Sequence, residues 1–186
     1  LKGIPSAFDR QADWRTPKGS YCSPNPLIDT GAVSFVYPGG FNTYPGVGRE
    51  FFHLFPSIHD KIEKVSLNTS DLIKDKMLYP RQMRALTPSD LAEAERKLAA
   101  DPLAMLVSGT CLSTVFTYLL RDVFKVNPSS SFGYSLGEIS MMFANDIWTQ
   151  VDETNEALHN SPLFHSRLAG AQNAIREKWG LPTVSQ

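Results

Sequence analysis

The chain has 186 residues, of which 42% are hydrophobic and 20% are charged, a balance typical of one water-soluble globular domain with a sizeable core. Its formal net charge of −1 at pH 7 gives no electrostatic reason to expect a nucleic-acid partner or an anionic membrane. Its two cysteines, Cys22 and Cys111, have no CxxC partner, so we expect no metal site or redox motif, and a cytoplasmic location is the default.

The first 31 residues are rich in proline, glycine and serine and show no hydrophobic period. Such a composition predicts an extended arm or linker. The opening stretch, residues 1–14, has no apolar h-region and does not read as a signal peptide. We therefore expect the folded domain to comprise residues 32–186.

The first regular elements are predicted soon after this arm. Residues 32–40, AVSFVYPGG, form a short β-branched and aromatic run stopped by Pro-Gly-Gly, which predicts a buried strand and a tight loop. Residues 46–65 have apolar residues at helical spacing that is broken near Pro56, so we expect two short helices. Residues 68–86 have a mixed pattern and predict a loop with some helix.

A well-marked helix start follows at Thr87. Thr87 suits the N-cap, Pro88 suits the first helical position, and Asp90 suits the first turn. These residues predict a helix over 87–100.

Residues 102–120 contain no charged residue, and the segment is long enough to cross a membrane. Serine, threonine and glycine residues dilute its hydrophobicity, so we expect no membrane span and instead predict a buried core helix at about 103–123. We expect this helix to pack on a sheet through Ser108, Gly109 and Cys111.

The rest of the chain alternates between strand and helix signals. Residues 130–134 predict a short strand, 136–148 a helix, and 152–160 and 163–179 two further helical segments. Strands that alternate with helices predict an α/β fold with a parallel sheet. In that sheet the strand at 33–37 should be a parallel neighbour, or near neighbour, of the strand at 130–134.

The sequence GYSLG at 133–137 matches the G-x-S-x-G nucleophile elbow. A serine at a sharp strand-to-helix turn has a strained backbone, and Gly133 and Gly137 remove side chains that would collide there. The turn lifts the Ser135 hydroxyl above the sheet edge and leaves the N–H of Leu136 pointing to where an oxyanion would form. The alternative is a loop serine in an ordinary glycine-bounded turn.

Three segments together carry a family resemblance. Residues 36–39, VYPG, residues 45–50, PGVGRE, and residues 135–138, SLGE, resemble the opening strand and loop, the first helix and the nucleophile motif of malonyl-type acyl-CoA:acyl carrier protein transacylases. SFVYPG, FGYSLGEISM and SPLFHSRLAGAQNAIREKWGL are closer still to the acyltransferase subunit of bacterial polyunsaturated fatty acid synthases and related polyketide-type synthases. The resemblance covers about residues 32–182.

The resemblance implies both a fold and a set of roles. It implies an incomplete large subdomain of α/β-hydrolase type, without the ferredoxin-like small subdomain of the family. Ser135 takes the place of the nucleophile, and the backbone N–H groups of Gly40 and Leu136 take the place of the oxyanion hole. Glu138 takes the place of a residue that supports the elbow. Arg167 lies near the position that binds a substrate carboxylate, although a surface arginine is the alternative.

Two residues depart from the family pattern. Gly40 replaces the usual Gln, which preserves a backbone donor, and Tyr134 replaces the usual His before the serine. The family's catalytic His lies well after the serine, and no histidine of this chain takes that place: the four are His53, His59, His159 and His165. We therefore expect an N-terminal fragment that is inactive alone, or half of a split enzyme.

The resemblance implies acyl transfer without a bound cofactor. Ser135 takes an acyl group, expected to be malonyl, from a coenzyme A thioester and passes it to the phosphopantetheine thiol of an acyl carrier protein. The implied partners are the acyl carrier protein and other synthase domains. Two alternatives remain: a serine hydrolase or editing thioesterase with water as the acceptor, and a non-catalytic acyltransferase-like docking module.

Overall fold

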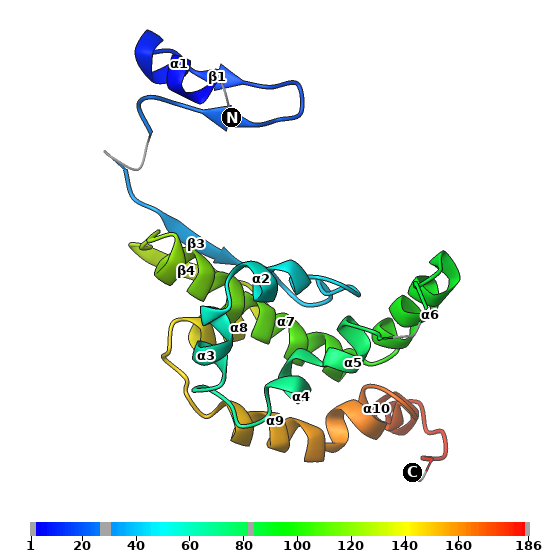
Figure 1. Cartoon of the computed structure of the whole chain (residues 1–186). Helices are drawn as coiled ribbons and strands as arrows, with labels where there is room; N and C mark the ends of the chain where they lie inside the picture. The colour runs from blue at the N-terminus through cyan, green and yellow to red at the C-terminus, as the bar shows by residue number, and fades with distance from the viewer. Residues whose placement is uncertain (1–2, 27–30, 82–83, 185–186) are drawn as a thin grey trace.

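The computed structural model describes residues 3–26, 31–81 and 84–184, and it combines many helices with two small sheets (Figure 1). The strands are β1 (Trp14–Arg15), β2 (Tyr21–Cys22), β3 (Ser34–Tyr37) and β4 (Ser130–Gly133). The α-helices are α1 (Ile4–Arg10), α2 (Arg49–Leu54), α3 (Ser57–Ile62), α4 (Thr69–Ile73), α5 (Asp75–Leu78), α6 (Pro88–Ala99), α7 (Pro102–Tyr118), α8 (Leu136–Ala144), α9 (Val151–Asn160) and α10 (Asn173–Lys178), and two π-helical turns are η2 (Leu119–Val123) and η3 (Leu163–Arg167). The class is therefore mixed and compatible with the predicted α/β fold.

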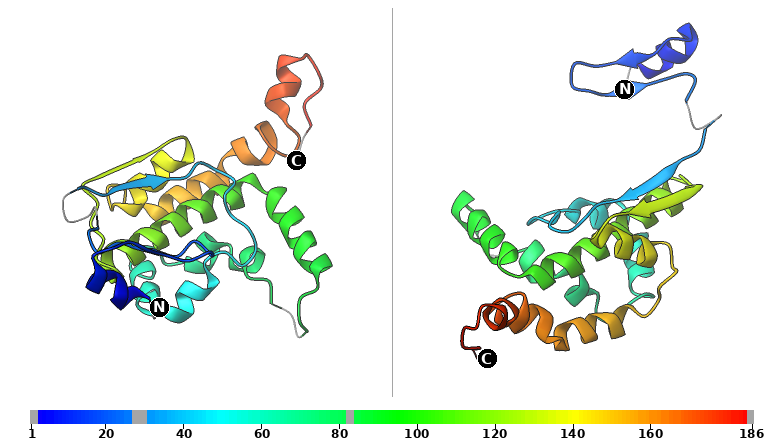
Figure 2. Two further views of the ribbon diagram at one scale, coloured as in Figure 1. Left: turned by 90° about the horizontal axis from the view of Figure 1, so that it is seen from above. Right: turned by 180° about the vertical axis from the view of Figure 1, so that it is seen from behind.

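The N-terminal segment contains more regular structure than its composition indicates. It holds helix α1 and an antiparallel ribbon of β1 and β2, in which Trp14 pairs with Cys22. Gly3 lies directly against the indole of Trp14, and Ala7 is buried. Figure 1 and the right-hand view of Figure 2 show this small unit apart from the rest of the chain. The domain boundary near residue 31 stays a prediction.

Strands β3 and β4 form the parallel pair that the sequence predicts. Ser34 is opposite Ser130 and Tyr37 is opposite Gly133, although 96 residues separate the partners in each pair. Tyr37 is buried, and its hydroxyl lies 2.9 Å from the hydroxyl of Thr117 on α7. Side chains alternate across a strand, so Val36 points to the opposite face and is 65% exposed. Among the described segments, helices therefore cover the face of this sheet that carries Tyr37 and leave the face of Val36 exposed.

The uncharged helix α7 is the centre of the core. Residues Pro102–Val123 are long and apolar enough to cross a membrane, but 72% of this stretch is buried inside the protein. Ser108 is fully buried and donates a hydrogen bond to the carbonyl of Ala104 at 2.6 Å, so its hydroxyl is satisfied within the helix. The buried-core-helix prediction is confirmed.

The face of α7 that meets the sheet differs in part from the prediction. Gly109, Ser113 and Thr117, which lie at successive helical turns, line one groove together with residues of β3. Cys111 does not face the sheet and instead packs among leucine and isoleucine side chains of α4, α5 and α6. Residues four apart share one face of a helix, whereas position 111 is displaced from that stripe. The prediction is right for Gly109 and wrong for Cys111.

Helix α6 begins as its sequence predicts. The Thr87 hydroxyl accepts a hydrogen bond from the Asp90 N–H, and the Asp90 carboxylate accepts one from the Thr87 N–H at 2.7 Å, which forms a capping box. The Arg84 guanidinium donates two more bonds to the same carboxylate. These hydrogen bonds hold the pKa of Asp90 well below its usual value.

The C-terminal part departs most from the predicted boundaries. Helix α8 ends at Ala144, four residues early, because Asp146 takes a left-handed backbone with φ of 59°. The single helix expected over 163–179 is divided into η3 and α10. Gly170 interrupts it with φ of 58°, and its α-carbon lies so close to the His165 carbonyl that a side chain would collide.

Candidate active site

Two residues, Tyr134 and Ser135, separate strand β4 from helix α8, and Ser135 is the N-cap of the helix. Its backbone has φ of 55° and ψ of −125°, a sparsely populated combination for a residue with a side chain that costs on the order of 1–3 kcal/mol. The side chain is exposed, and its hydroxyl makes no hydrogen bond with any residue that the structure describes. Ser135 thus combines a strained backbone with a hydroxyl that has no described hydrogen-bond partner, at a strand-to-helix corner.

The two glycines of the motif are required by contacts between backbone atoms. A Cβ on Gly133 would lie 2.2 Å from the carbonyl carbon of Gly137. A Cβ on Gly137 would lie 2.3 Å from the carbonyl oxygen of Tyr37 at the end of β3. Real Cβ atoms do not approach so closely, so only glycine fits either position. The spacing of the motif therefore follows from the packing of the corner.

The loop after β3 lies against the start of α8. Besides the contact at Tyr37, the position of a Cβ on Gly137 is 2.9 Å from the Pro38 carbonyl oxygen. A Cβ on Gly40 would approach a methyl group of Leu106 at 3.3 Å and one of Leu136 at 4.0 Å. Within the described segments, neither the N–H of Gly40 nor that of Leu136 donates a hydrogen bond to another backbone group. The Gly40 loop therefore lies close to the side chain of Leu136, the first residue of α8, and the predicted pair of oxyanion donors stays a prediction.

Glu138 lies in the first turn of α8 and is exposed. Its carboxylate makes no hydrogen bond or ion pair with the residues described here, so its predicted support of the corner stays a prediction. A negative charge in the first helical turn is favourable to the helix dipole in any case. Tyr134, which precedes the serine, is 87% exposed.

The structure does not bring Arg167 to the Ser135 corner. Arg167 lies in η3, which packs on α9 and α10, and its guanidinium donates two hydrogen bonds to the Glu177 carboxylate at 3.1 and 3.2 Å. Figure 1 shows these C-terminal helices on the other side of α7 from β3 and β4. The predicted carboxylate-binding arginine is therefore already paired with a carboxylate of its own chain.

No histidine contacts Ser135 through a described hydrogen bond. His159 lies 3.1 Å from the Lys74 ammonium and 2.8 Å from the Asn155 carbonyl, and His165 bonds to the His159 carbonyl. His53 and His59 line a separate pocket. None of these contacts joins a histidine to Ser135, and the lack of a general base in this chain stays a prediction.

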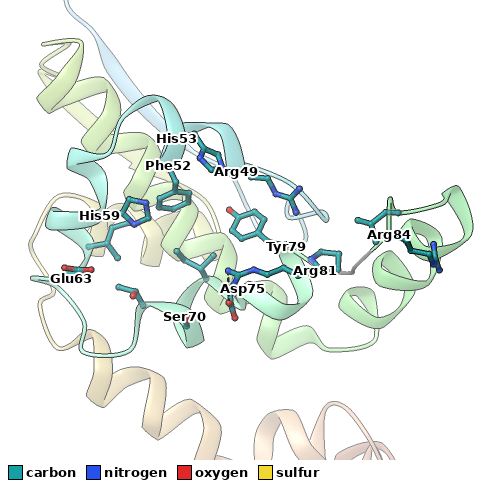
Figure 3. A pocket seen from close by; sticks show the side chains of 15 residues that line it. Arg49, Phe52, His53, His59, Glu63, Ser70, Asp75, Tyr79, Arg81 and Arg84 are labelled. Carbon is teal, nitrogen blue, oxygen red and sulfur yellow. Dashed lines mark ion pairs between the residues drawn. The ribbon is translucent and has the colours of Figure 1, made fainter.

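That separate pocket lies among α2, α3, α4 and α5, and Figure 3 shows it from close by. Its volume is about 850 Å³. The Arg49 guanidinium lies 5.4 Å from the centre of the Tyr79 ring, and Arg81 pairs with Asp75 at 3.5 Å. Burial raises the pKa of Tyr79 to about 12. Ser135 is not part of this lining, and the described residues contain no cluster of His, Cys, Asp and Glu suited to a metal.

Comparison with known proteins relates the chain to synthases. It is 33% identical over 183 residues to one subunit of the polyunsaturated fatty acid synthase of a Thraustochytrium species, an alignment that covers 97% of the chain and 9% of that protein. It is 25% identical to two non-reducing polyketide synthases, over 142 residues in Gibberella zeae and 121 in Aspergillus ustus. These cover 76% and 65% of the chain, and 6% and 5% of the synthases.

No family model matches the chain, and no solved structure matches it. The chain is homologous to components of fatty acid and polyketide synthases. It spans less than a tenth of the length of each of these relatives.

Proposed function

We propose that this chain carries the nucleophile of an acyltransferase that acts in fatty acid or polyketide synthesis. It transfers an acyl group from a coenzyme A thioester, through an ester on Ser135, to the phosphopantetheine thiol of an acyl carrier protein. The observation that supports this most is the strained backbone of Ser135 with the Gly40 loop beside it. The homologues are fatty acid and polyketide synthases, which agrees with such a role.

The chemistry has two steps of the same kind. The Ser135 oxygen attacks the thioester carbonyl, its proton passes to a base, and the carbon–sulfur bond breaks to release coenzyme A with that proton. In the second step the phosphopantetheine thiol attacks the serine ester, and the serine oxygen recovers a proton as it leaves. In both steps the carbonyl oxygen gains negative charge, which the N–H groups of Gly40 and Leu136 stabilise.

We infer that the general base comes from another part of the synthase. An unassisted serine hydroxyl is a poor nucleophile, and the four histidines of this chain lie in α2, α3, α9 and η3 with other partners or in another pocket. The isolated chain should therefore acylate slowly. A small base supplied in solution should restore part of the rate.

The test is acylation of the purified chain by malonyl-CoA and acetyl-CoA, with and without imidazole, followed by intact mass spectrometry. We expect an adduct on Ser135 that imidazole accelerates and that pantetheine then removes as an acyl thioester. Ser135→Ala should abolish the adduct, and Ser129→Ala, six residues upstream, should retain it. Release as free acid would identify a hydrolase or editing thioesterase instead. No adduct under any condition would support a non-catalytic docking module.

Malonyl selectivity through Arg167 stays a separate proposal. A malonyl carboxylate would have to replace Glu177 on the Arg167 guanidinium. If it does, Arg167→Ala should lower malonyl transfer by a factor of roughly ten to a hundred and leave acetyl transfer unchanged or higher. Equal losses for both substrates would assign Arg167 to the fold. No loss for either would leave it a surface residue.

A further inference from the structure

A second, much smaller cavity lies between α7, α8 and α9, with a volume of about 170 Å³. Its walls are mainly aliphatic and aromatic, and the described residues contribute no charged side chain to it. Leu106 and Cys111 contribute from α7, Leu136 and Ile139 from α8, and Leu158 from α9. A site of this composition favours an uncharged, apolar ligand.

One end of this cavity lies beneath the Ser135 corner. Leu106 and Leu136 line the cavity, and they are also the two side chains that a Cβ on Gly40 would meet, at 3.3 and 4.0 Å. Leu136 is the residue that follows the serine. Ile139, one turn further along α8, also lines the cavity and is 41% exposed, so this part of the lining reaches the surface. The side chains of Leu106 and Leu136 thus form a shared wall between the cavity and the Gly40 loop, next to the Ser135 corner.

The volume sets the size of the ligand. An apolar protein cavity of about 150 Å³ stays free of water and binds a six-carbon ring. A cavity of about 170 Å³ therefore accepts roughly four to six carbons of an alkyl chain. Each methylene that it removes from water should improve the reaction about fourfold, until the cavity is full.

We propose that this cavity binds the alkyl chain of the acyl group carried by Ser135, and that it selects uncharged straight chains of about four to six carbons. This inference rests on the proposed acyltransferase function and adds its substrate class. It also agrees with the pairing of Arg167 to Glu177, which leaves that arginine occupied. Leu158, at the α9 wall, is the residue that limits the chain length.

The experiment compares acetyl-, butyryl-, hexanoyl- and octanoyl-CoA as acyl donors for the wild-type chain, with imidazole present. The readout is the rate of Ser135 acylation relative to acetyl-CoA, measured by intact mass spectrometry. At about fourfold for each added methylene, we expect a rise of about fifteenfold from acetyl to butyryl and about 200-fold from acetyl to hexanoyl, and a fall at octanoyl. Leu158→Trp should fill the cavity and reduce the hexanoyl-to-acetyl ratio by about tenfold or more. Leu158→Ala should enlarge it and move the optimum to octanoyl.

Leu91→Trp on α6, an exposed leucine outside the cavity, is the matched control and should keep the wild-type ratios. A shift toward longer chains in Leu158→Ala cannot come from partial unfolding, because unfolding lowers every rate together. Acylation with the same ratios in all four proteins would overturn the cavity assignment and leave the acyltransferase proposal standing. No acylation by any donor would overturn the acyltransferase proposal and this inference with it.

Discussion

The Ser135 corner and the C-terminal helices are held in place by different kinds of contact. At the corner, backbone atoms of Gly133, Gly137 and Tyr37 approach so closely that no side chain fits between them. The helix beneath, α7, buries thirteen of its seventeen residues. By contrast α9, η3 and α10 contain no buried residue. Close backbone contacts thus fix the Ser135 corner. The C-terminal helices form a wall whose side chains can be substituted without altering the corner.

Helix α9 is attached largely through polar contacts. The Asp152 carboxylate accepts hydrogen bonds from the Ser66 hydroxyl at 2.5 Å and the Leu67 N–H at 2.9 Å, and Asn155 donates to Asp71 at 2.7 Å. Partly exposed contacts of this kind each contribute little net free energy. Helix α9, one wall of the proposed acyl cavity, is therefore expected to be held less firmly than the Ser135 corner.

The largest effect should come from adding one methyl group at the corner. Gly137→Ala places a Cβ 2.3 Å from the Tyr37 carbonyl oxygen, and we expect it to lower the free energy of unfolding by about 3 kcal/mol or more. Gly39→Ala is the matched control, since its Cβ would lie 3.8 Å from the nearest atom. It should change stability by less than about 1 kcal/mol. Urea titration followed by circular dichroism measures both, and equal effects would contradict the backbone argument.

Truncation of a leucine to alanine should lower the free energy of unfolding more in α7, beneath the corner, than in α9. Leu112 on α7 is 3% exposed and belongs to the core, so Leu112→Ala should cost about 2–5 kcal/mol of unfolding free energy. Leu158 on α9 is only partly buried against that core, so Leu158→Ala should cost about 1 kcal/mol. Thermal and urea unfolding give the two values. A larger loss for Leu158→Ala would show that α9 belongs to the core.

The corner was predictable because local rules and tertiary contacts agree there. Glycine two residues before and two residues after Ser135, a short strand before it and a helix after it indicated the turn. The parallel arrangement of β3 and β4 was expected from the alternation of strands and helices. The helix start at Thr87 was equally predictable, and it forms a capping box with Asp90. The residues of the turn and of the capping box are close together in the sequence, whereas β3 and β4 come from segments 96 residues apart.

The cavity and the C-terminal breaks were not predictable in this way. The cavity depends on where α9 lies against α7 and α8, and no local pattern states that position. Cys111 suited a sheet-facing role by its small size, but the stripe at Gly109, Ser113 and Thr117 met the sheet instead. The position of Arg167 in the chain order suggested that it binds a substrate carboxylate. Only the structure reveals that its guanidinium donates to the Glu177 carboxylate.

As the pH falls, helix α9 should lose its protection from hydrogen exchange before helix α7, beneath the Ser135 corner, does. Burial raises the pKa of Asp71, but hydrogen bonds from Lys74 and Asn155 outweigh it and keep this pKa below its ordinary value. A lowered pKa means that the contribution to stability is present above about pH 3.9, the unfolded value, and is lost as the pH falls further toward the folded value. Hydrogen exchange should therefore quicken in α9 below about pH 4 while α7 stays protected. Asp71→Asn should remove this acid step, and simultaneous loss of both helices would contradict the comparison.

The smallest effect should be seen in the reactivity of Cys111, which lines the cavity. Burial raises the pKa of its thiol to about 12, so at pH 8 only about one molecule in ten thousand carries the reactive thiolate. In Cys22→Ser, which leaves Cys111 as the one thiol of the chain, alkylation by iodoacetamide should follow only the rare opening of α9 away from α7. Adding Leu158→Ala should raise that rate about fivefold, the equivalent of about 1 kcal/mol of easier opening. An unchanged rate would show that the opening of α9 away from α7 does not control access to Cys111, which would contradict the weak attachment of α9.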